Sequence, residues 1–182
     1  MARILITGSA DGLGQLSARS LAEQGHQVVL HARNAERGRY AQQHVPGAEH
    51  VIVGDLSDID ATKNVADQAN ALGRFDAVIH NAGVYQAPPE DIFRVNILAP
   101  YLLTCLMHKP RRLIYLSSDM HLQGHANLEI FKTDMRRINY GRVSFKPLVL
   151  NGIGHNHNLI VVYVIGTKRI LTGHSFYIGA PP

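Results

Sequence analysis

The stretch Ile4-Leu5-Ile6-Thr7-Gly8-Ser9-Ala10-Asp11-Gly12-Leu13-Gly14 decides the fold. A short apolar run leads into a glycine-rich turn, and a helical pattern follows. Glycines in such a turn allow a positive φ and a close approach of the backbone to a ligand. The free N–H groups at the start of the next helix then favour an anion, usually a phosphate. We therefore expect Gly8 to form the turn, Gly12 to permit close approach and Gly14 to let the helix pack on the strand.

Strand-like and helix-like segments alternate along the chain after this stretch. Strands are expected at 3–7, 27–31, 50–53, 76–80 and 112–116, and helices at 13–24, 34–44, from Asp58 or Asp60 to 71, and 90–107. This alternation predicts βαβ units with right-handed crossovers, and hence an α/β fold with a doubly wound parallel sheet between two layers of helices. In the first helix, one face is expected to carry Leu13, Leu16, Ser17, Leu21 and Ala22.

The spacing of the glycines carries a family resemblance. Thr7-Gly8-x3-Gly12-x-Gly14 differs from the commoner G-x-G-x-x-G dinucleotide fingerprint and resembles that of the short-chain dehydrogenase/reductase family. The resemblance implies a Rossmann-type fold, a nicotinamide cofactor, and hydride transfer with a small carbonyl or alcohol substrate. An ordinary glycine-rich loop is the alternative for this motif alone. The resemblance implies that the cofactor is bound by Thr7, Gly8, Ser9, Gly12, Leu13 and Gly14.

The second strand is followed by a basic residue, Arg33. In dinucleotide folds a carboxylate at this point binds the ribose 2′-OH of NAD, whereas an arginine accommodates the 2′-phosphate of NADP. No acidic residue lies here, and the guanidinium is a permanent cation whose shape matches a phosphate. We therefore predict NADP(H) as the cofactor in preference to NAD. A surface arginine at a strand end is the alternative.

Two further strand ends match the family's cofactor motifs. Asp55 and Leu56 follow the third strand, where the family recognises adenine, although an Asp there also serves as a helix N-cap. Asn81-Ala82-Gly83 follows the fourth strand and resembles the family's N-A-G turn beside the cofactor. These residues extend the expected cofactor site across neighbouring strands.

Two residues are candidates for the chemistry. Asn96 lies in Phe93-Arg94-Val95-Asn96, which resembles the segment that holds the family's active-site Asn, where it would keep a water for proton relay. We expect it to be buried because its neighbours are apolar; a solvent-facing Asn is the alternative. Ser118 is the second residue of the pair after the fifth strand, and its hydroxyl would bond the substrate oxygen. A plain turn is the alternative for Ser118.

The resemblance covers residues 4 to about 121. Within the family, the sequence most resembles the retinol-dehydrogenase-like reductases. The resemblance then fails at a decisive point, because the family needs a Tyr and, four residues later, a Lys that lowers the pKa of the phenol. No Tyr-x3-Lys occurs in the chain: Tyr140 is followed by Ser144, and if Lys146 were that Lys, Arg142 would hold the Tyr position. A non-catalytic NADP-binding protein (a sensor, an interaction module or a degenerate reductase) is therefore the alternative function.

The strand–helix rhythm blurs after about residue 127. We interpret 1–182 as a single NADP-binding domain whose part 128–182 is divergent, so that the sheet is incomplete on its C-terminal side. The apolar run 159–165 predicts a buried strand, which is either the sixth of the sheet or paired elsewhere. A change of reading frame in the gene and a genuinely divergent protein both account for this part.

Composition excludes several classes of protein. The length of 182 residues, with 46% hydrophobic and 18% charged residues, fits one globular domain. The single cysteine, Cys105, rules out a disulfide within the chain and favours a reducing, cytoplasmic location; we expect it to be a core residue. No signal peptide or transmembrane run is expected, so we predict no membrane association.

The charge and the histidines indicate few other partners. A net charge of +4 is mild, and the basic clusters are short and lack aromatic residues, so nucleic acid is not expected. His155-x-His157, with His174 further on, is the one metal-like spacing, and no Cys or acidic partner lies near it. We therefore expect no metal site. A homo-oligomer is left open.

Overall fold

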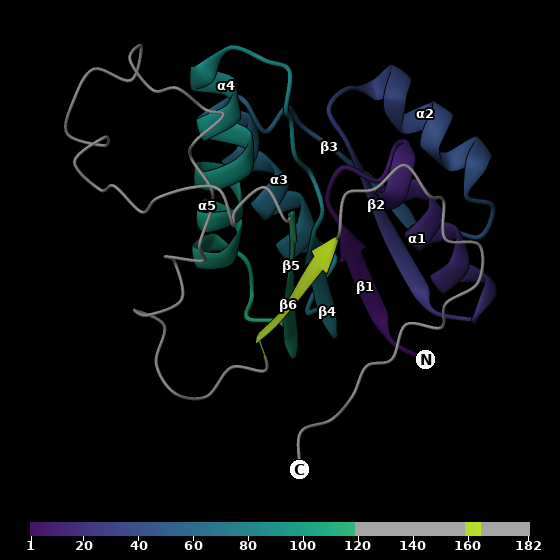
Figure 1. Cartoon of the computed structure of the whole chain (residues 1–182). Coiled ribbons are helices and arrows are strands. Elements are labelled where there is room, and N and C mark those ends of the chain that lie inside the picture. The colour runs from purple at the N-terminus through teal and green to yellow at the C-terminus, as the bar shows by residue number, and fades with distance from the viewer. Residues whose placement is uncertain (119–158, 165–182) are drawn as a thin grey trace.

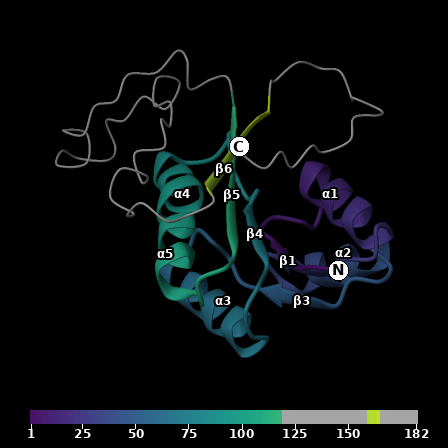
Figure 2. The same cartoon turned by 90° about the horizontal axis from the view of Figure 1, so that it is seen from below.

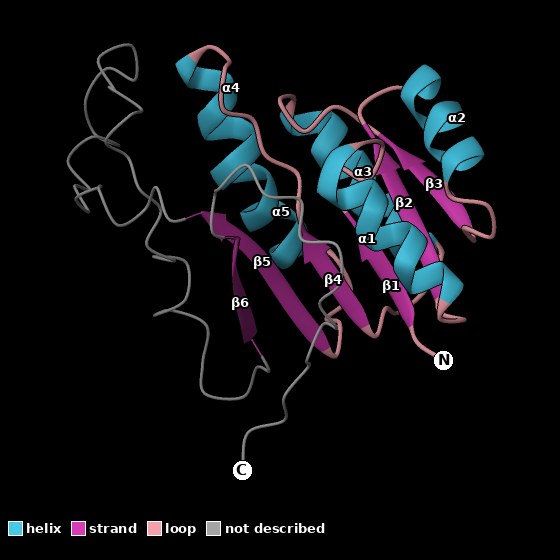
Figure 3. Cartoon of the chain, turned by 45° about the vertical axis from the view of Figure 1, so that its right-hand side comes forward, coloured by secondary structure: helices cyan, strands magenta, loops and turns pink. Residues whose placement is uncertain are grey.

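The computed structural model describes residues 1–118 and 159–164 of the chain. Six parallel strands form one sheet in the order β3-β2-β1-β4-β5-β6 (Figures 1 and 3). Their bounds are β1 Arg3–Ile6, β2 Gln27–Ala32, β3 His50–Val53, β4 Ala77–His80, β5 Arg112–Ser118 and β6 Leu159–Val164. The order reverses direction between β1 and β4, which is the doubly wound arrangement that the alternating pattern predicts.

Helices cover both faces of the sheet, so the fold has the expected three layers (Figure 2). One face carries α1 (Gly12–Glu23) and α2 (Ala35–His44), and the other carries α3 (Ile59–Ala71) and α5 (Ala99–Leu106). A short helix α4 (Pro89–Phe93) and a π-helical segment η1 (Arg94–Leu98) lead into α5. No helix in the described ranges is both long enough and apolar enough to cross a bilayer.

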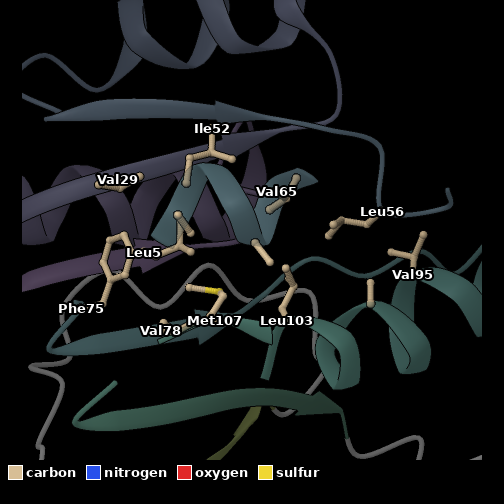
Figure 4. Close-up of a cluster of buried hydrophobic side chains, with 13 residues drawn as sticks. Leu5, Val29, Ile52, Leu56, Val65, Phe75, Val78, Val95, Leu103 and Met107 are labelled. Atoms are coloured by element: carbon tan, nitrogen blue, oxygen red, sulfur yellow. The ribbon is translucent and has the colours of Figure 1, made fainter. Parts of the chain in front are cut away.

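Each face of the sheet has its own hydrophobic core. Between the sheet and α3 and α5, Leu5, Ile52 and Val78 are packed with Phe75 and Leu103 (Figure 4). The other core lies beneath α1 and α2. It contains Ile4, Ile6, Ala10, Ala18, Val28, Leu30, Ala32, Ala41, Val45 and Ala77. Since full burial of a large aliphatic side chain stabilises by roughly 1.5–3 kcal/mol, these two cores hold the sheet and set where the strand ends lie.

The packing face of α1 differs from the expected one. Leu13 and Leu16 are 55% and 58% exposed, and the fully buried residues of the helix are Gly14 and Ala18. Small residues on this face let the helix axis lie close to β1 and β2, so the larger leucines are turned away from the sheet. The periodicity located the helix but assigned these two leucines to the wrong face.

The helix expected over 90–107 is interrupted. It consists of α4, η1 and α5, with Pro100 in the first turn of α5. Because proline has no N–H, the carbonyl of Asn96 cannot receive an ordinary i→i+4 bond from residue 100, and the helix widens locally into a π-helical turn.

Cys105 is exposed, so its assignment to the core was wrong. The buried residues of α5 are Ala99 and Leu103, which lie one turn apart on the face toward the sheet. Cys105 follows Leu103 by two residues, which places it on the opposite side of the helix.

The apolar run near residue 160 forms the sixth strand. β6 pairs in parallel with β5, in a register that begins at Leu113↔Leu159 and ends at Ser118↔Val164. Of the two alternatives left open by the pattern, pairing at the edge of the same sheet is the observed one.

Candidate functional site

All six strands are parallel, so their carboxyl ends meet at one edge of the sheet (Figure 3). The glycine-rich turn follows β1, Arg33 follows β2, Asp55 follows β3 and the Asn81-Ala82-Gly83 turn follows β4. Ser118 is the last residue of β5; the register pairs Tyr115 with His80, so Ser118 lies three residues, about 10 Å, beyond the end of β4. The fold therefore gathers the candidate residues at one edge.

Two of these turns are clasped together by side-chain hydrogen bonds. The buried Thr7 hydroxyl accepts from the backbone N–H groups of Asn81 and Ala82, both at 3.0 Å. In return, the Asn81 side-chain amide donates to the carbonyls of Thr7 and Gly8, both at 2.9 Å. The turn after β1 and the turn after β4 therefore form one rigid unit.

The three glycines of the fingerprint have different surroundings. Gly8 has φ +64°, and a Cβ there would lie 2.8 Å from the Ala82 Cα. A Cβ at Gly14 would lie 2.4 Å from both the Asn81 amide nitrogen and the Gly8 carbonyl oxygen. Gly12 has φ +53°, and no atom lies within 4 Å of the position of its Cβ. Gly8 and Gly14 thus allow the chain to pack on itself, whereas Gly12 leaves space over the turn.

His31, which the sequence analysis treated only as part of a strand, locks the glycine-rich turn to its neighbours. Its Nδ1 accepts from the Gly8 N–H and its Nε2 donates to the Gly54 carbonyl, both at 3.0 Å. These partners define a neutral ring with the proton on Nε2. Burial lowers the pKa of His31 to about 4, against smaller raising effects of the Gly54 carbonyl and the Asp55 charge.

A second buried histidine ends β4. His80 stacks on Tyr115 with ring centroids 4.7 Å apart, and its Nε2 lies 3.3 Å from the Thr104 hydroxyl. Thr104 donates to the Pro100 carbonyl at 2.7 Å, so its oxygen accepts from the Tyr115 hydroxyl, which is 2.6 Å away. Within the described part of the chain, the Nδ1 of His80 has no hydrogen-bond partner. Burial lowers the pKa of His80 to about 4.

The residues after β3 divide their roles. Asp55 accepts from both the N–H and the hydroxyl of Ser57, at 2.9 and 2.8 Å. The N-cap of α3 is Asp58, whose carboxylate accepts from the Ala61 N–H at 2.7 Å. Asp58, and not Asp55, is therefore the N-cap of α3, and Asp55 lies at the end of β3. Leu56 is buried in the core beside α3, and its adenine role stays a prediction.

Asn96 is half-buried, where the sequence analysis expected a buried residue. Its Oδ1 accepts from the Val84 N–H and its Nδ2 donates to the Val84 carbonyl, both at 2.8 Å. The amide therefore holds the loop that follows the Asn81-Ala82-Gly83 turn. The water-holding role expected for Asn96 stays a prediction.

Two charged groups lie near the end of β2. Arg33 is exposed, and in the described part of the chain it forms no ion pair. Arg37, in the first turn of α2, forms an ion pair with Asp11 of the glycine-rich turn. No local pattern indicates this pair, because only the fold brings residues 11 and 37 together.

Several residues named in the sequence analysis lie outside the described residues. They are Arg142, Ser144, Lys146, Tyr140, His155, His157 and His174. Among the residues that are described, no group of three His, Cys, Asp or Glu side chains is placed to hold a metal ion.

Replacing Thr7 with Val tests the clasp, that is, the hydrogen bonds by which Thr7 and Asn81 join the turn after β1 to the turn after β4. We expect a loss of about 1–3 kcal/mol in the free energy of unfolding, because the Ala82 N–H loses its acceptor and the Asn81 N–H retains only Ile79. Thr7→Ser keeps the hydroxyl and is the matched control. Urea denaturation of the three chains measures the difference, and equal stability of the Val and Ser variants would contradict a role for the hydroxyl.

Comparisons with known proteins agree with this architecture. The family model for short chain dehydrogenases matches residues 2–110. An uncharacterized oxidoreductase of Emericella nidulans is 58% identical over 139 residues, covering 70% of this chain and 54% of the relative. Human retinol dehydrogenase 13 is 30% identical over 155 residues, covering 75% of this chain and 47% of the relative. The chain thus spans about half the length of these curated relatives.

A solved structure is similar in fold and in sequence. It is a metagenomic short-chain oxidoreductase in complex with NADP, with a TM-score of 0.59 and 29% identity, covering 69% of this chain and 66% of that one. The clasped turns at the sheet edge, the family match over most of the described residues and the identity to the Emericella oxidoreductase lead to one conclusion. The chain belongs to the short-chain dehydrogenase family and is retinol-dehydrogenase-like within it.

Proposed function

We propose that this chain binds NADP(H) at the carboxyl edge of the sheet and interconverts a carbonyl and an alcohol by hydride transfer. The observation that carries the proposal is the clasp between the two turns. Thr7 and Asn81 hold the glycine-rich turn against the turn after β4, while Gly12 leaves open space above it. Such a rigid, open turn at a strand end suits a dinucleotide.

The residues present fit the phosphates of the cofactor. The first N–H groups of an α-helix have no partner within the helix, and the Asp11 side chain at the N-cap of α1 makes no bond to them. Those N–H groups and the positive end of the helix are therefore available to a pyrophosphate. Arg33 would bind the 2′-phosphate, Asp55 and Leu56 the adenine, and 81–83 would line the nicotinamide side. The NADP in the similar metagenomic oxidoreductase supports this cofactor.

The chemistry is divided between cofactor and chain. When bound, the nicotinamide supplies or accepts the hydride. The Ser118 hydroxyl would donate a hydrogen bond to the substrate oxygen, which orients the carbonyl and stabilises negative charge on that oxygen. Asn96 would hold the proton-relay water, and its bonds to Val84 keep the adjoining loop in place.

A second function is favoured by one specific observation. The sequence contains no Tyr-x3-Lys pair to supply the proton. Loss of a general acid lowers a rate by about 10²–10⁴-fold. A chain that binds NADP(H) without turnover, as a sensor or interaction module, is therefore the competing proposal. For either function we propose a cytoplasmic location, because the single cysteine is unpaired.

Titration of the purified chain with NADPH and with NADH, followed by calorimetry, tests the cofactor. We expect NADPH to bind more tightly, and Arg33→Gln to weaken NADPH about 10-fold while NADH changes less than about 2-fold, since one phosphate contact is lost. Arg39→Gln, on the exposed side of α2, removes the same charge and is the control. Failure to bind either dinucleotide would overturn the proposal, and a preference for NADH would overturn the role of Arg33.

The two functions separate on turnover. Consumption of NADPH with a panel of aldehydes and ketones is followed at 340 nm. A rate that Ser118→Ala abolishes supports the reductase. Saturable NADPH binding with no consumption above the protein-free rate supports the non-catalytic protein.

A further inference from the structure

The ion pair between Asp11 and Arg37 connects the glycine-rich turn to α2. The Asp11 side chain is 72% exposed and does not cap α1; it turns to Arg37. The Arg37 guanidinium also lies over the Tyr40 ring, 5.3 Å from its centroid. The side-chain Oδ1 of Asn34, the N-cap of α2, accepts from the Arg37 backbone N–H at 2.9 Å, which fixes the start of the helix. The backbone of Arg37 is thus fixed, while its guanidinium contacts Asp11 and the Tyr40 ring.

The span that this ion pair bridges is itself fixed. The Ser9 N–H donates to the His31 carbonyl at 3.0 Å, and the Ser9 hydroxyl accepts from the His31 N–H at 2.9 Å. The His31 ring holds Gly8 at the same time. The turn that carries Asp11 is therefore tied to the end of β2, two residues before Arg33. Arg33, Arg37 and Asp11 are among the charged residues near this strand end.

We propose that the Asp11–Arg37 pair sets the preference between NADPH and NADH. The inference rests on the proposed function. Asp11 places a negative charge beside the strand end where Arg33 would bind the 2′-phosphate, and two anions at close range repel each other. Arg37 neutralises Asp11 and is the second cation available to the phosphate. The preference is thus a balance in which Asp11 opposes the 2′-phosphate and Arg37 favours it.

The physical chemistry gives the two residues opposite effects. An exposed ion pair contributes only about 0–1 kcal/mol, so Arg37 is easily redirected from Asp11 to a doubly charged phosphate. Removing the Asp11 charge releases Arg37 and lifts the repulsion. Removing the Arg37 charge leaves Asp11 uncompensated. The 2′-OH of NADH carries no charge, so both changes should affect NADH much less than NADPH.

Titrations of four chains with NADPH and NADH test the inference: the unaltered chain, Asp11→Asn, Arg37→Gln and the double variant. We expect Asp11→Asn to tighten NADPH about 3- to 10-fold and Arg37→Gln to weaken it about 10-fold, with NADH changed less than about 2-fold in each. Both effects should shrink between 50 and 500 mM salt because they arise from exposed charges. Arg39→Gln on α2, and Asp67→Asn on α3 across the sheet, are matched charge controls.

The outcomes separate this inference from the proposed function. An unaltered chain that binds neither dinucleotide overturns both. An unaltered chain that prefers NADPH, with the same ratio of affinities in Asp11→Asn and Arg37→Gln, overturns the role of the ion pair and leaves the proposed cofactor intact. Opposite shifts in the two variants, absent from both controls, support the balance. Loss of folding is monitored in each chain by circular dichroism.

Discussion

Replacing Gly14 with Ala is expected to destabilise the folded chain by about 3 kcal/mol or more and to abolish dinucleotide binding. The added Cβ would lie 2.4 Å from the Gly8 carbonyl oxygen and the Asn81 amide nitrogen, both of which belong to the clasp. The Gly8 oxygen is backbone and the Asn81 side-chain nitrogen is held by hydrogen bonds to the Thr7 and Gly8 carbonyls, so the turn itself must move. Alanine is favoured over glycine in a helix by about 1 kcal/mol, and a net loss therefore isolates the steric effect.

Gly12→Ala is the matched control for this substitution. Gly12 also belongs to the fingerprint, but no atom meets its Cβ, and only the positive φ of 53° opposes alanine. We expect a loss of about 1–2 kcal/mol, which leaves the chain folded. Urea denaturation gives both values. Equal destabilisation of the two variants would contradict the claim that Gly14, and not Gly12, is closed in by the chain.

Acidification is expected to destabilise the chain strongly between pH 7 and pH 5. His31 and His80 have pKa values lowered to about 4, whereas a histidine in the unfolded chain titrates near 6.5. In this window the unfolded state binds more protons than the folded state, so the free energy of unfolding falls as the pH falls. Each histidine accounts for about 2 kcal/mol of loss by pH 5, and the loss ends near pH 4.

Denaturation curves at pH 7, 6 and 5 measure this effect. His31→Gln and His80→Gln should each remove about half of the pH dependence. His44 is exposed at the end of α2, and His44→Gln is the control for replacing a histidine outside the two buried sites. A stability that does not vary between pH 7 and pH 5 would show that the two buried rings are not the neutral groups of the folded state. Above pH 7 neither histidine contributes further change.

The order of the strands and helices could be predicted from the sequence because it depends on local periodicity and on glycine and proline. The expected strand at 27–31 is β2, and Asp58 begins α3 by capping it. The prediction of which helix face is buried failed, because the packing of the helix against the sheet decides that face. Leu13 and Leu16 fit an apolar helical face, yet close packing on β1 and β2 selected Gly14 and Ala18 instead.

The candidate site also has features that the sequence predicts and features that depend on the fold. The spacing of Gly8, Gly12 and Gly14 identifies a dinucleotide turn, because those residue types are required wherever the backbone turns sharply or approaches a ligand. Which glycine is closed in by the chain and which is open to a ligand depends on Ala82 and Asn81, more than sixty residues away. A local sequence pattern cannot indicate how close Gly8 and Gly14 lie to Ala82 and Asn81.

The family, the parallel sheet and the residues at its strand ends could be predicted from the amino-acid sequence, because strand–turn–helix units are encoded in contiguous residues. How those ends are joined depends on the three-dimensional fold. The fold brings the Thr7 hydroxyl to the turn after β4, the His31 ring between Gly8 and Gly54, and Arg37 to Asp11. These contacts join residues from different βα units, and they form only when parallel strands bring their carboxyl ends to one edge.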